Sequence, residues 1–116
     1  MEVGFFTMPI HPIDKDYKKT LSEDREAFLL ADKIGFSEAY CGEHVTDAAE
    51  NITSSALFIA SLASETKKIR LGTGTVNMPN SHPAAIAGQI AMLDHMLDGR
   101  FNFGISPGGL ASDAET

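Results

Sequence analysis

The chain has 116 residues, of which 43% are hydrophobic and 22% are charged, and it carries a formal net charge of −7. This length suits one domain and is too short for two, and the composition is that of a folded protein rather than a disordered one. The acidic balance excludes a nucleic-acid-binding surface, which needs clustered Lys and Arg, and no apolar run approaches the about 20 residues that span a bilayer.

Four short segments have the composition of buried strands. Their centres are about 31 to 35 residues apart, and they are Val3–Thr7, Ser37–Glu43, Ile69–Thr75 and Phe101–Ser106. A (β/α)8 barrel of about 250 residues contains one strand in roughly every 31 residues. The regular interval therefore predicts successive units of such a barrel.

Helical patterns fill the intervals between these strands. We expect the first helix to begin after Ser22, a suitable N-cap, and to end at Gly35, which readily adopts the left-handed conformation. A second helix is expected over about Thr53–Thr66. A third is expected over about Pro83–Leu97, and its proline suits the first helical turn. Both are rich in small side chains, which suit packing either on the chain's own sheet or against another subunit.

Strands that alternate with helices predict a parallel sheet covered by helices. We therefore expect an α/β fold in which residues 1–116 form one partial domain, the N-terminal half (about four βα units) of a (β/α)8 TIM barrel. With four strands of the eight, the chain should form a homo-oligomer or associate with the missing C-terminal half. The inner face of the half barrel should be apolar or aromatic, with Leu71, Phe5 or Phe6, and Phe101 or Phe103.

A doubly wound nucleotide-binding fold is the structural alternative. It requires a glycine-rich turn directly after the first strand, and the segment Thr7–Pro12 contains no glycine. Gly72 and Gly74 do form a G-x-G pair, but the pair lies within a predicted strand, and Asn77 stands at the third glycine position. We reject the doubly wound fold on these grounds.

The catalytic groups of a barrel lie at the carboxyl ends of its strands. His44 is the main candidate for a catalytic acid/base, because imidazole exchanges protons near neutral pH. Adjacent Glu43 could act on His44, or it could point to the other face of the strand and bond elsewhere. A purely structural His44, bonded to a backbone carbonyl, is the alternative. The carboxyl ends collect polar residues and glycines, and they are Phe6–Met8, Glu43–His44, Thr73–Asn77 and Ser106–Gly109.

No metal site is expected. No two of the four histidines have the spacing of metal ligands, and the single cysteine, Cys41, lies inside a predicted strand, where a core position is expected. A lone cysteine cannot form an internal disulfide, and the acidic N-terminus lacks the basic region of a secretory signal. Both observations lead us to expect a cytoplasmic protein.

Ordered motifs cover nearly the whole chain. The first are Gly4–Phe6, Ala31–Phe36 and the strand that ends in Glu43 and His44. The others are Ile69–Gly74, Met78–Pro83, Leu93–Phe101 and Phe103–Ser106. In this order and at these spacings, the set resembles the bacterial luciferase family of flavin monooxygenases.

The resemblance implies reduced FMN from a separate flavin reductase, addition of O2 to the flavin C4a atom, and transfer of one oxygen atom to a small apolar organic substrate. It also implies that a non-prolyl cis peptide joins Gly74 and Thr75 beneath the flavin ring. The remaining assignments that it implies are His44 as the catalytic acid/base, Glu43 among the cofactor-binding residues, Ser106 near the reactive edge of the flavin, and Phe6 in the substrate pocket.

Two positions depart from the luciferase pattern. Val45 stands where luciferases have a second histidine, and Pro107 stands where they have an arginine that contacts the flavin phosphate. The segment Ser106–Gly109 is more similar to monooxygenases of terpenes and related apolar substrates, so bioluminescence is not expected. Two alternatives stay open: an F420-dependent oxidoreductase of the same fold, and a truncated, non-catalytic unit for flavin binding or assembly.

Overall fold

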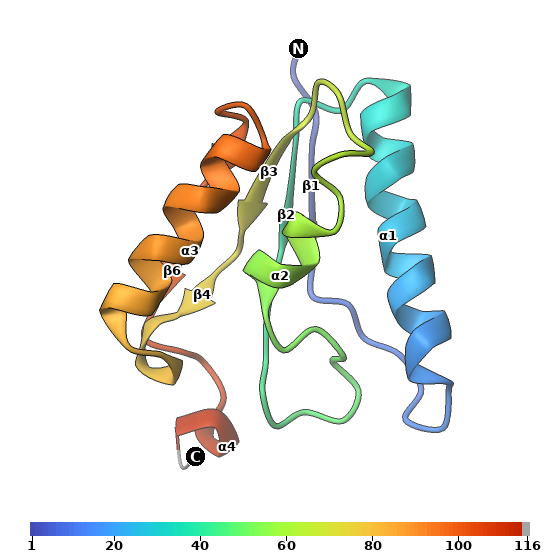
Figure 1. Cartoon of the computed structure of the whole chain (residues 1–116). Helices are drawn as coiled ribbons and strands as arrows, with labels where there is room; N and C mark the ends of the chain where they lie inside the picture. The colour runs from blue at the N-terminus through green and yellow to red at the C-terminus, as the bar shows by residue number, and fades with distance from the viewer. Residues whose placement is uncertain (115–116) are drawn as a thin grey trace.

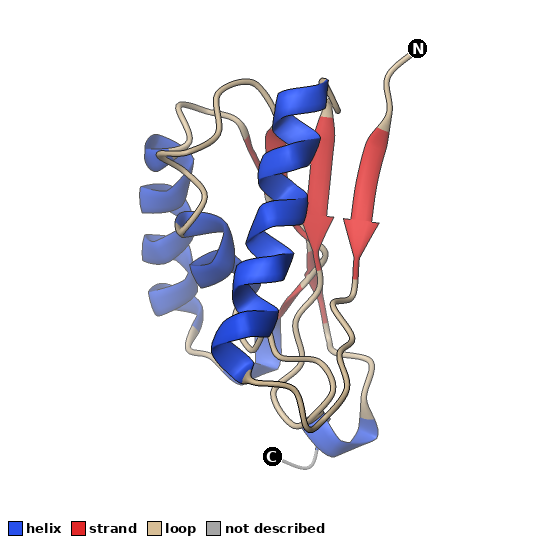
Figure 2. Cartoon of the chain, turned by 90° about the vertical axis from the view of Figure 1, so that its right-hand side faces the viewer, coloured by secondary structure: helices blue, strands red, loops and turns tan. Residues whose placement is uncertain are grey.

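The parallel sheet that the strand spacing predicts is present in the computed structural model, which describes residues 1–114 (Figure 1). Four parallel strands are paired in the order β1 (Gly4–Thr7), β2 (Glu38–Cys41), β3 (Arg70–Thr73) and β5 (Phe101–Asn102). A separate parallel ladder joins β4 (Val76–Asn77) to β6 (Ile105–Ser106). One side of the sheet is covered by α1 (Tyr17–Ile34), α2 (Ser55–Ala60) and α3 (Pro83–Met96), and the short helices are η1 (Met78–Asn80) and α4 (Ala111–Ala114) (Figure 2).

The register of the strands decides which side chains face the helices. Phe5, Ala39, Leu71 and Phe101 lie side by side across the four strands, and the last three are buried. Neighbouring side chains along each strand point to the opposite face. On that face, Phe6 keeps 59% of its surface exposed.

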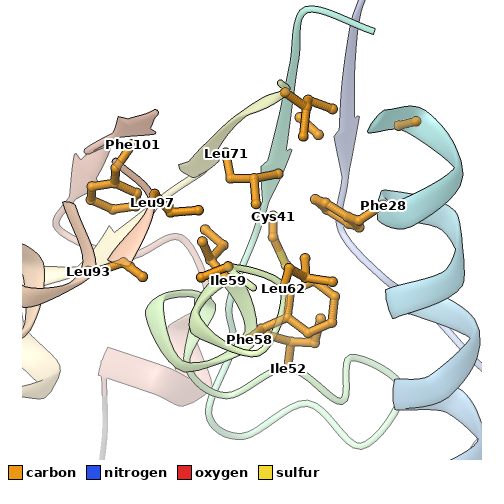
Figure 3. Packing of buried hydrophobic residues seen from close by; sticks show 14 residues of the cluster. Phe28, Cys41, Ile52, Phe58, Ile59, Leu62, Leu71, Leu93, Leu97 and Phe101 are labelled. Atoms are coloured by element: carbon orange, nitrogen blue, oxygen red, sulfur yellow. The ribbon is translucent and has the colours of Figure 1, made fainter. Parts of the chain in front are cut away.

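The core lies between the sheet and helices α1, α2 and α3 (Figure 3). Phe28 of α1 packs edge-on against both Phe5 and Phe58 of α2, with ring centroids 5.2 Å apart in each pair. On the α3 side, Leu93 completes the same cluster. Cys41 is fully buried in it, which confirms the expected core position of this cysteine.

The inner face of the sheet is more polar than expected. The Tyr40 hydroxyl donates to Glu38 Oε2 (3.1 Å) and accepts from Asn102 Nδ2 (2.9 Å). Arg70 Nη2 donates to Asn102 Oδ1 (2.8 Å), which extends this chain of hydrogen bonds. The prediction of an apolar inner face is therefore wrong in part. A shift of one residue along a strand exchanges its two faces, so composition did not determine that Leu71, Phe5 and Phe101 face the helices.

Two of the predicted strands are each interrupted. The segment Ile69–Thr75 breaks after Thr73, and Phe101–Ser106 breaks around Gly104. At the break, the Thr73 hydroxyl accepts from Gly104 N and donates to Gly104 O, each at 2.9 Å. A side chain thus takes the place of a backbone partner, and the chain resumes as β4 and β6.

Helix α1 begins six residues earlier than predicted. Asp16 is its N-cap and accepts from Lys19 N at 3.0 Å, so Ser22 lies inside the helix rather than at its start. No glycine or proline separates the two positions, and an aspartate caps as well as a serine does. The predicted end is confirmed, because Gly35 adopts the left-handed conformation at φ 95°.

Helix α2 is much shorter than the predicted Thr53–Thr66. After Ala60 the chain continues in turns, where Ser61 Oγ donates to Phe58 O (2.6 Å) and Thr66 Oγ1 donates to Leu62 O (3.0 Å). Such local bonds from hydroxyl groups compete with helical geometry. Helix α3 matches its predicted range to within one residue. None of the helices within residues 1–114 is long and apolar enough to cross a membrane.

The Asp32 side chain ties the end of α1 to the segment before β3. Its carboxylate accepts hydrogen bonds from the backbone N–H groups of Lys67, Lys68 and Ile69 at 2.9 to 3.0 Å. Burial by itself would raise the pKa of this carboxyl, but the bonds from the three N–H groups outweigh it and lower the pKa. The ionised form is therefore the one that stabilises the fold.

We predict that Asp32→Ala lowers the free energy of unfolding at neutral pH and that its effect fades in acid. Because the folded-state pKa of Asp32 is lowered, its contribution is complete above the ordinary carboxyl pKa and is lost as the pH falls through the lowered value. Urea unfolding of both proteins between about pH 7 and about pH 3 measures this. Asp14→Ala, at an exposed loop position, is the control. A difference between wild type and Asp32→Ala that does not change with pH would contradict the prediction.

Candidate active site

The predicted site residues gather at the carboxyl ends of the strands. The loops that follow β1 and β2, the β4–β6 ladder and α4 lie together at this end of the molecule (Figure 1). The strands of a parallel sheet all point the same way, so their carboxyl ends bring together residues that are far apart in the sequence.

Glu43 is buried two residues after β2, and both of its carboxylate oxygens are occupied. Oε2 accepts from Ser55 N (2.7 Å) and Ser55 Oγ (2.8 Å), and Oε1 accepts from Asn77 N (2.8 Å). The Asn77 amide donates in return to Glu43 O at 3.0 Å. Glu43 therefore braces the start of α2 against β4, and its place among the cofactor-binding residues stays a prediction.

Ser106 and Thr75 are joined in one hydroxyl chain. Thr75 Oγ1 donates to Ser106 Oγ (2.5 Å), and Ser106 Oγ donates to Asn77 Oδ1 (3.0 Å). Gly108 N also donates to Ser106 Oγ at 3.2 Å. Through Asn77 this chain reaches Glu43. The structure thus places three of the predicted residues in one connected network.

A cis peptide bond joins Gly74 and Thr75, as the family resemblance predicts. The Phe6 ring lies against this segment, because a Cβ atom on Gly74 would come within 2.8 Å of Phe6 Cε2. A side chain at this position would require the Phe6 ring to shift. Phe6 and the Gly74–Thr75 backbone therefore form one surface at the open inner face.

His44 directly follows Glu43, and its side chain is 11% exposed. Its backbone N–H donates to Ile52 O at 3.0 Å, which fixes the main chain of the loop at this point. Its Nδ1 atom forms an ion pair with Glu50 Oε2, and the Glu50 side chain is 13% exposed. The alternative of a His44 ring bonded to a backbone carbonyl is not what the structure shows, since its partner is a carboxylate.

Asp113 of α4 holds the loop after His44. Its carboxylate accepts from Thr46 N (2.9 Å), Val45 N (3.3 Å) and the Thr46 hydroxyl (2.5 Å). The bond from the Thr46 hydroxyl, followed by those from the two N–H groups, lowers the pKa of Asp113, although desolvation opposes the change. At neutral pH, Asp113 is thus a negative charge near His44.

A pocket of about 320 Å³ opens beside this network. Asn77 and Asp113 contribute polar groups to its wall, and Pro107, Gly108 and Leu110 contribute apolar surface. Gly108 adopts the left-handed conformation at φ 95°, which shapes the turn after Ser106. The pocket therefore adjoins Ser106 at the carboxyl end of β6.

Sequence reasoning missed three residues of this arrangement. Asn77 was noted at a strand end and as a missing glycine but was given no role, although it links Glu43 to Ser106. Glu50 and Asp113 lie outside the predicted strands and helices and belong to no motif. Neither has a signal in the sequence, because only the folded loops bring their carboxylates toward His44 and Thr46.

Neither a reactive cysteine nor a metal site is found among residues 1–114. Burial raises the pKa of the Cys41 thiol, which keeps it protonated in the core. Within residues 1–114, no three His, Cys, Asp or Glu side chains are grouped as metal ligands would be.

Known proteins share both the sequence and the fold. The chain is 40% identical over 110 residues to 4-hydroxyprotoasukamycin monooxygenase of Streptomyces nodosus subsp. asukaensis. This match covers 95% of this chain and 30% of that protein. It is 37% identical over 115 residues to limonene 1,2-monooxygenase of Rhodococcus erythropolis, and this match covers 99% of this chain and 30% of that protein. The chain therefore spans about a third of the length of these relatives.

A solved structure superimposes closely on the chain. It is the oxygenating constituent of 3,6-diketocamphane monooxygenase from the CAM plasmid of Pseudomonas putida, in complex with FMN. The TM-score is 0.94 at 29% sequence identity, over 99% of this chain and 32% of that one. All of residues 1–116 match the family described as luciferase-like monooxygenase. The chain belongs to this family, and its four βα units are those of the N-terminal half of a (β/α)8 barrel.

Proposed function

We propose that the complete protein is an FMN-dependent monooxygenase that uses reduced flavin and O2 to oxygenate a small apolar organic substrate. One observation supports this proposal above the others: the Phe6 ring lies against the cis Gly74–Thr75 segment, and the Thr75 hydroxyl is bonded to Ser106. The buried His44 follows Glu43, which Asn77 links to Ser106. These groups come from β1, the β3–β4 connection, β6 and the β2 loop.

The residues present fit a flat aromatic cofactor. The Phe6 ring and the adjoining backbone offer an apolar surface. Gly74 keeps this surface open because it has no side chain, and a Cβ atom on Gly74 would contact the Phe6 ring. The hydroxyl groups of Thr75 and Ser106 lie at its border and can donate to or accept from polar ring atoms. When bound, reduced flavin supplies the reaction with O2. Phe6, Gly74, Thr75 and Ser106 would hold it, and Glu43 would keep Asn77 and β4 in place.

Proton exchange would fall to His44. Its Nδ1 atom is paired with Glu50, and Nε2 would then be the atom that takes or gives a proton. The pocket of about 320 Å³ between Asn77 and Asp113 has a partly apolar wall and would take the organic substrate. We expect the enzyme to work in the cytoplasm, where a separate reductase can supply reduced flavin.

Reconstitution tests the proposed function. The complete protein is mixed with FMN, NADH and a flavin reductase, and O2 uptake is followed with a panel of small terpenes and cyclic ketones. We expect substrate-dependent O2 uptake and a product that carries one oxygen atom from ¹⁸O2. Binding of F420 in preference to FMN, with F420 reduction, would favour the deazaflavin alternative. FMN binding without any oxygenated product across the panel would favour a non-catalytic flavin-binding unit.

Association with further strands follows from the open sheet. β1 and β5 are the edges of the four-stranded sheet, and edge strands invite pairing with another chain or segment. Phe103 and Ile105 also expose 45% and 58% of their surfaces. We predict that the 116-residue chain by itself forms a homo-oligomer, or that it binds the C-terminal half when both are present. Size-exclusion chromatography with light scattering measures this, and a folded particle with the mass of one chain would contradict it.

A further inference from the structure

Glu50 and His44 are each other's partner in a buried position. The Nδ1 atom of His44 and the Oε2 atom of Glu50 form an ion pair, and both atoms are inaccessible to solvent. Among the residues that the structure describes, neither atom forms a hydrogen bond, and the ion pair is the contact between them. A buried polar atom without a partner is costly, so each side chain keeps the other in place.

The main chain holds Glu50 where it meets His44. Glu50 N donates to Asp47 O (3.3 Å), and Ala49 N donates to the Asp47 side chain (2.8 Å), which closes a turn. The turn is fastened to the loop after β1 by a β-bridge between Ile10 and Glu50 and by a bond from His11 N to Ala49 O (2.8 Å). The pairing therefore does not depend on a mobile surface side chain.

The other carboxylates around His44 are engaged elsewhere. Glu43 binds Ser55 and Asn77, and Asp113 of α4 binds the backbone of Val45 and Thr46 together with the Thr46 hydroxyl. Asp113 contributes negative charge to the surroundings of the imidazole. Within residues 1–114, the carboxylate that is paired with the ring itself is that of Glu50.

We propose that Glu50 is a positioning residue that accepts the Nδ1–H of His44, fixes this tautomer, and leaves Nε2 to exchange the proton with the reacting molecule. An acceptor on one imidazole nitrogen determines which nitrogen carries the proton and how the ring is oriented. This inference rests on the proposed function, since it gives His44 the task of proton exchange. Glu50 does not touch the substrate or flavin and acts through His44.

Imidazole ¹⁵N chemical shifts test the tautomer directly. In the complete protein labelled with ¹⁵N-histidine, His44 is assigned by the signal that His44→Ala removes. We expect a protonated Nδ1 in the wild type and in Glu26→Gln, a control at an exposed position of α1. Glu50→Ala should abolish the preference for this tautomer. Glu50→Gln retains an acceptor oxygen and should preserve it. A tautomer pattern that is the same in Glu50→Ala and wild type would overturn the inference.

Kinetics supply the second readout. Glu50→Ala should lower kcat by about 10- to 100-fold, with a much smaller change in KM, because ring orientation rather than binding is lost. Glu50→Gln should recover much of this loss and should move the acidic limb of the pH–kcat profile to lower pH, since the negative charge beside the ring is gone. If Glu50→Ala does not fold, this shift in Glu50→Gln decides, and an unmoved profile counts against the inference. If His44→Ala retains full turnover while the tautomer still depends on Glu50, the positioning contact stands and the proposed proton exchange fails.

Discussion

His44→Ala, made in the complete enzyme, should reduce turnover by about 10²- to 10⁴-fold, the usual range for the loss of a general acid/base. His44 lies at the strand end where a barrel places its catalytic groups, and its buried ring is paired with Glu50 through Nδ1. FMN affinity should change much less, because Phe6, Gly74, Thr75 and Ser106 are untouched. Rapid mixing of the reduced, flavin-loaded protein with O2 and substrate separates the oxygen-transfer step from flavin binding.

A matched control is available on α3. His95→Ala removes an exposed imidazole from the last turn of that helix and should leave turnover unchanged. Thermal unfolding of both variants is needed, since His44→Ala leaves the buried Glu50 carboxylate without its partner. Oxygen transfer at the wild-type rate in a folded His44→Ala variant would remove His44 from the mechanism.

Gly104→Ala should destabilise the protein by about 3 kcal/mol, because a Cβ atom at this position would lie 2.3 Å from the backbone oxygen of Thr73. A backbone atom cannot move aside as a flexible side chain can, so β3 and the Gly104 segment would have to separate. The same glycine accepts from Val76 N at 2.8 Å and is bonded to the Thr73 hydroxyl. Its displacement would therefore also disturb the Gly74–Thr75 segment and weaken FMN binding.

Gly88→Ala is the natural comparison for this variant. Gly88 lies in α3, and a Cβ atom there would meet nothing within 4 Å. Alanine in a helix interior is favoured over glycine by about 0.5–1 kcal/mol, so this variant should be slightly more stable than wild type. Thermal and denaturant unfolding of the two variants in parallel measures the contrast. Equal stability of Gly104→Ala and Gly88→Ala would show that the close approach at Thr73 does not constrain the fold.

The sequence by itself determined the order of the elements and the end of the molecule that carries the site. Apolar segments at a regular interval alternate with helical patterns, and this alternation allows only a parallel sheet with helices packed on it. Local signals were reliable where a single residue has a strong preference, as with Gly35 after α1 and Pro83 in the first turn of α3. The strand ends then brought Glu43, Thr75 and Ser106 into one network.

Tertiary structure decided the features that depend on contacts between distant segments. Phe5 and Phe6 are alike in composition, and the pairing register with Ala39, Leu71 and Phe101 is what sends Phe5 toward the helices. The strand breaks arise because Thr73 and Gly104 meet across 31 residues. The pairing of Glu50 with His44 depends on how a loop closes against the residues after β1. Loop geometry and side-chain packing determine such contacts. The periodicity and the local preferences of the sequence do not predict them.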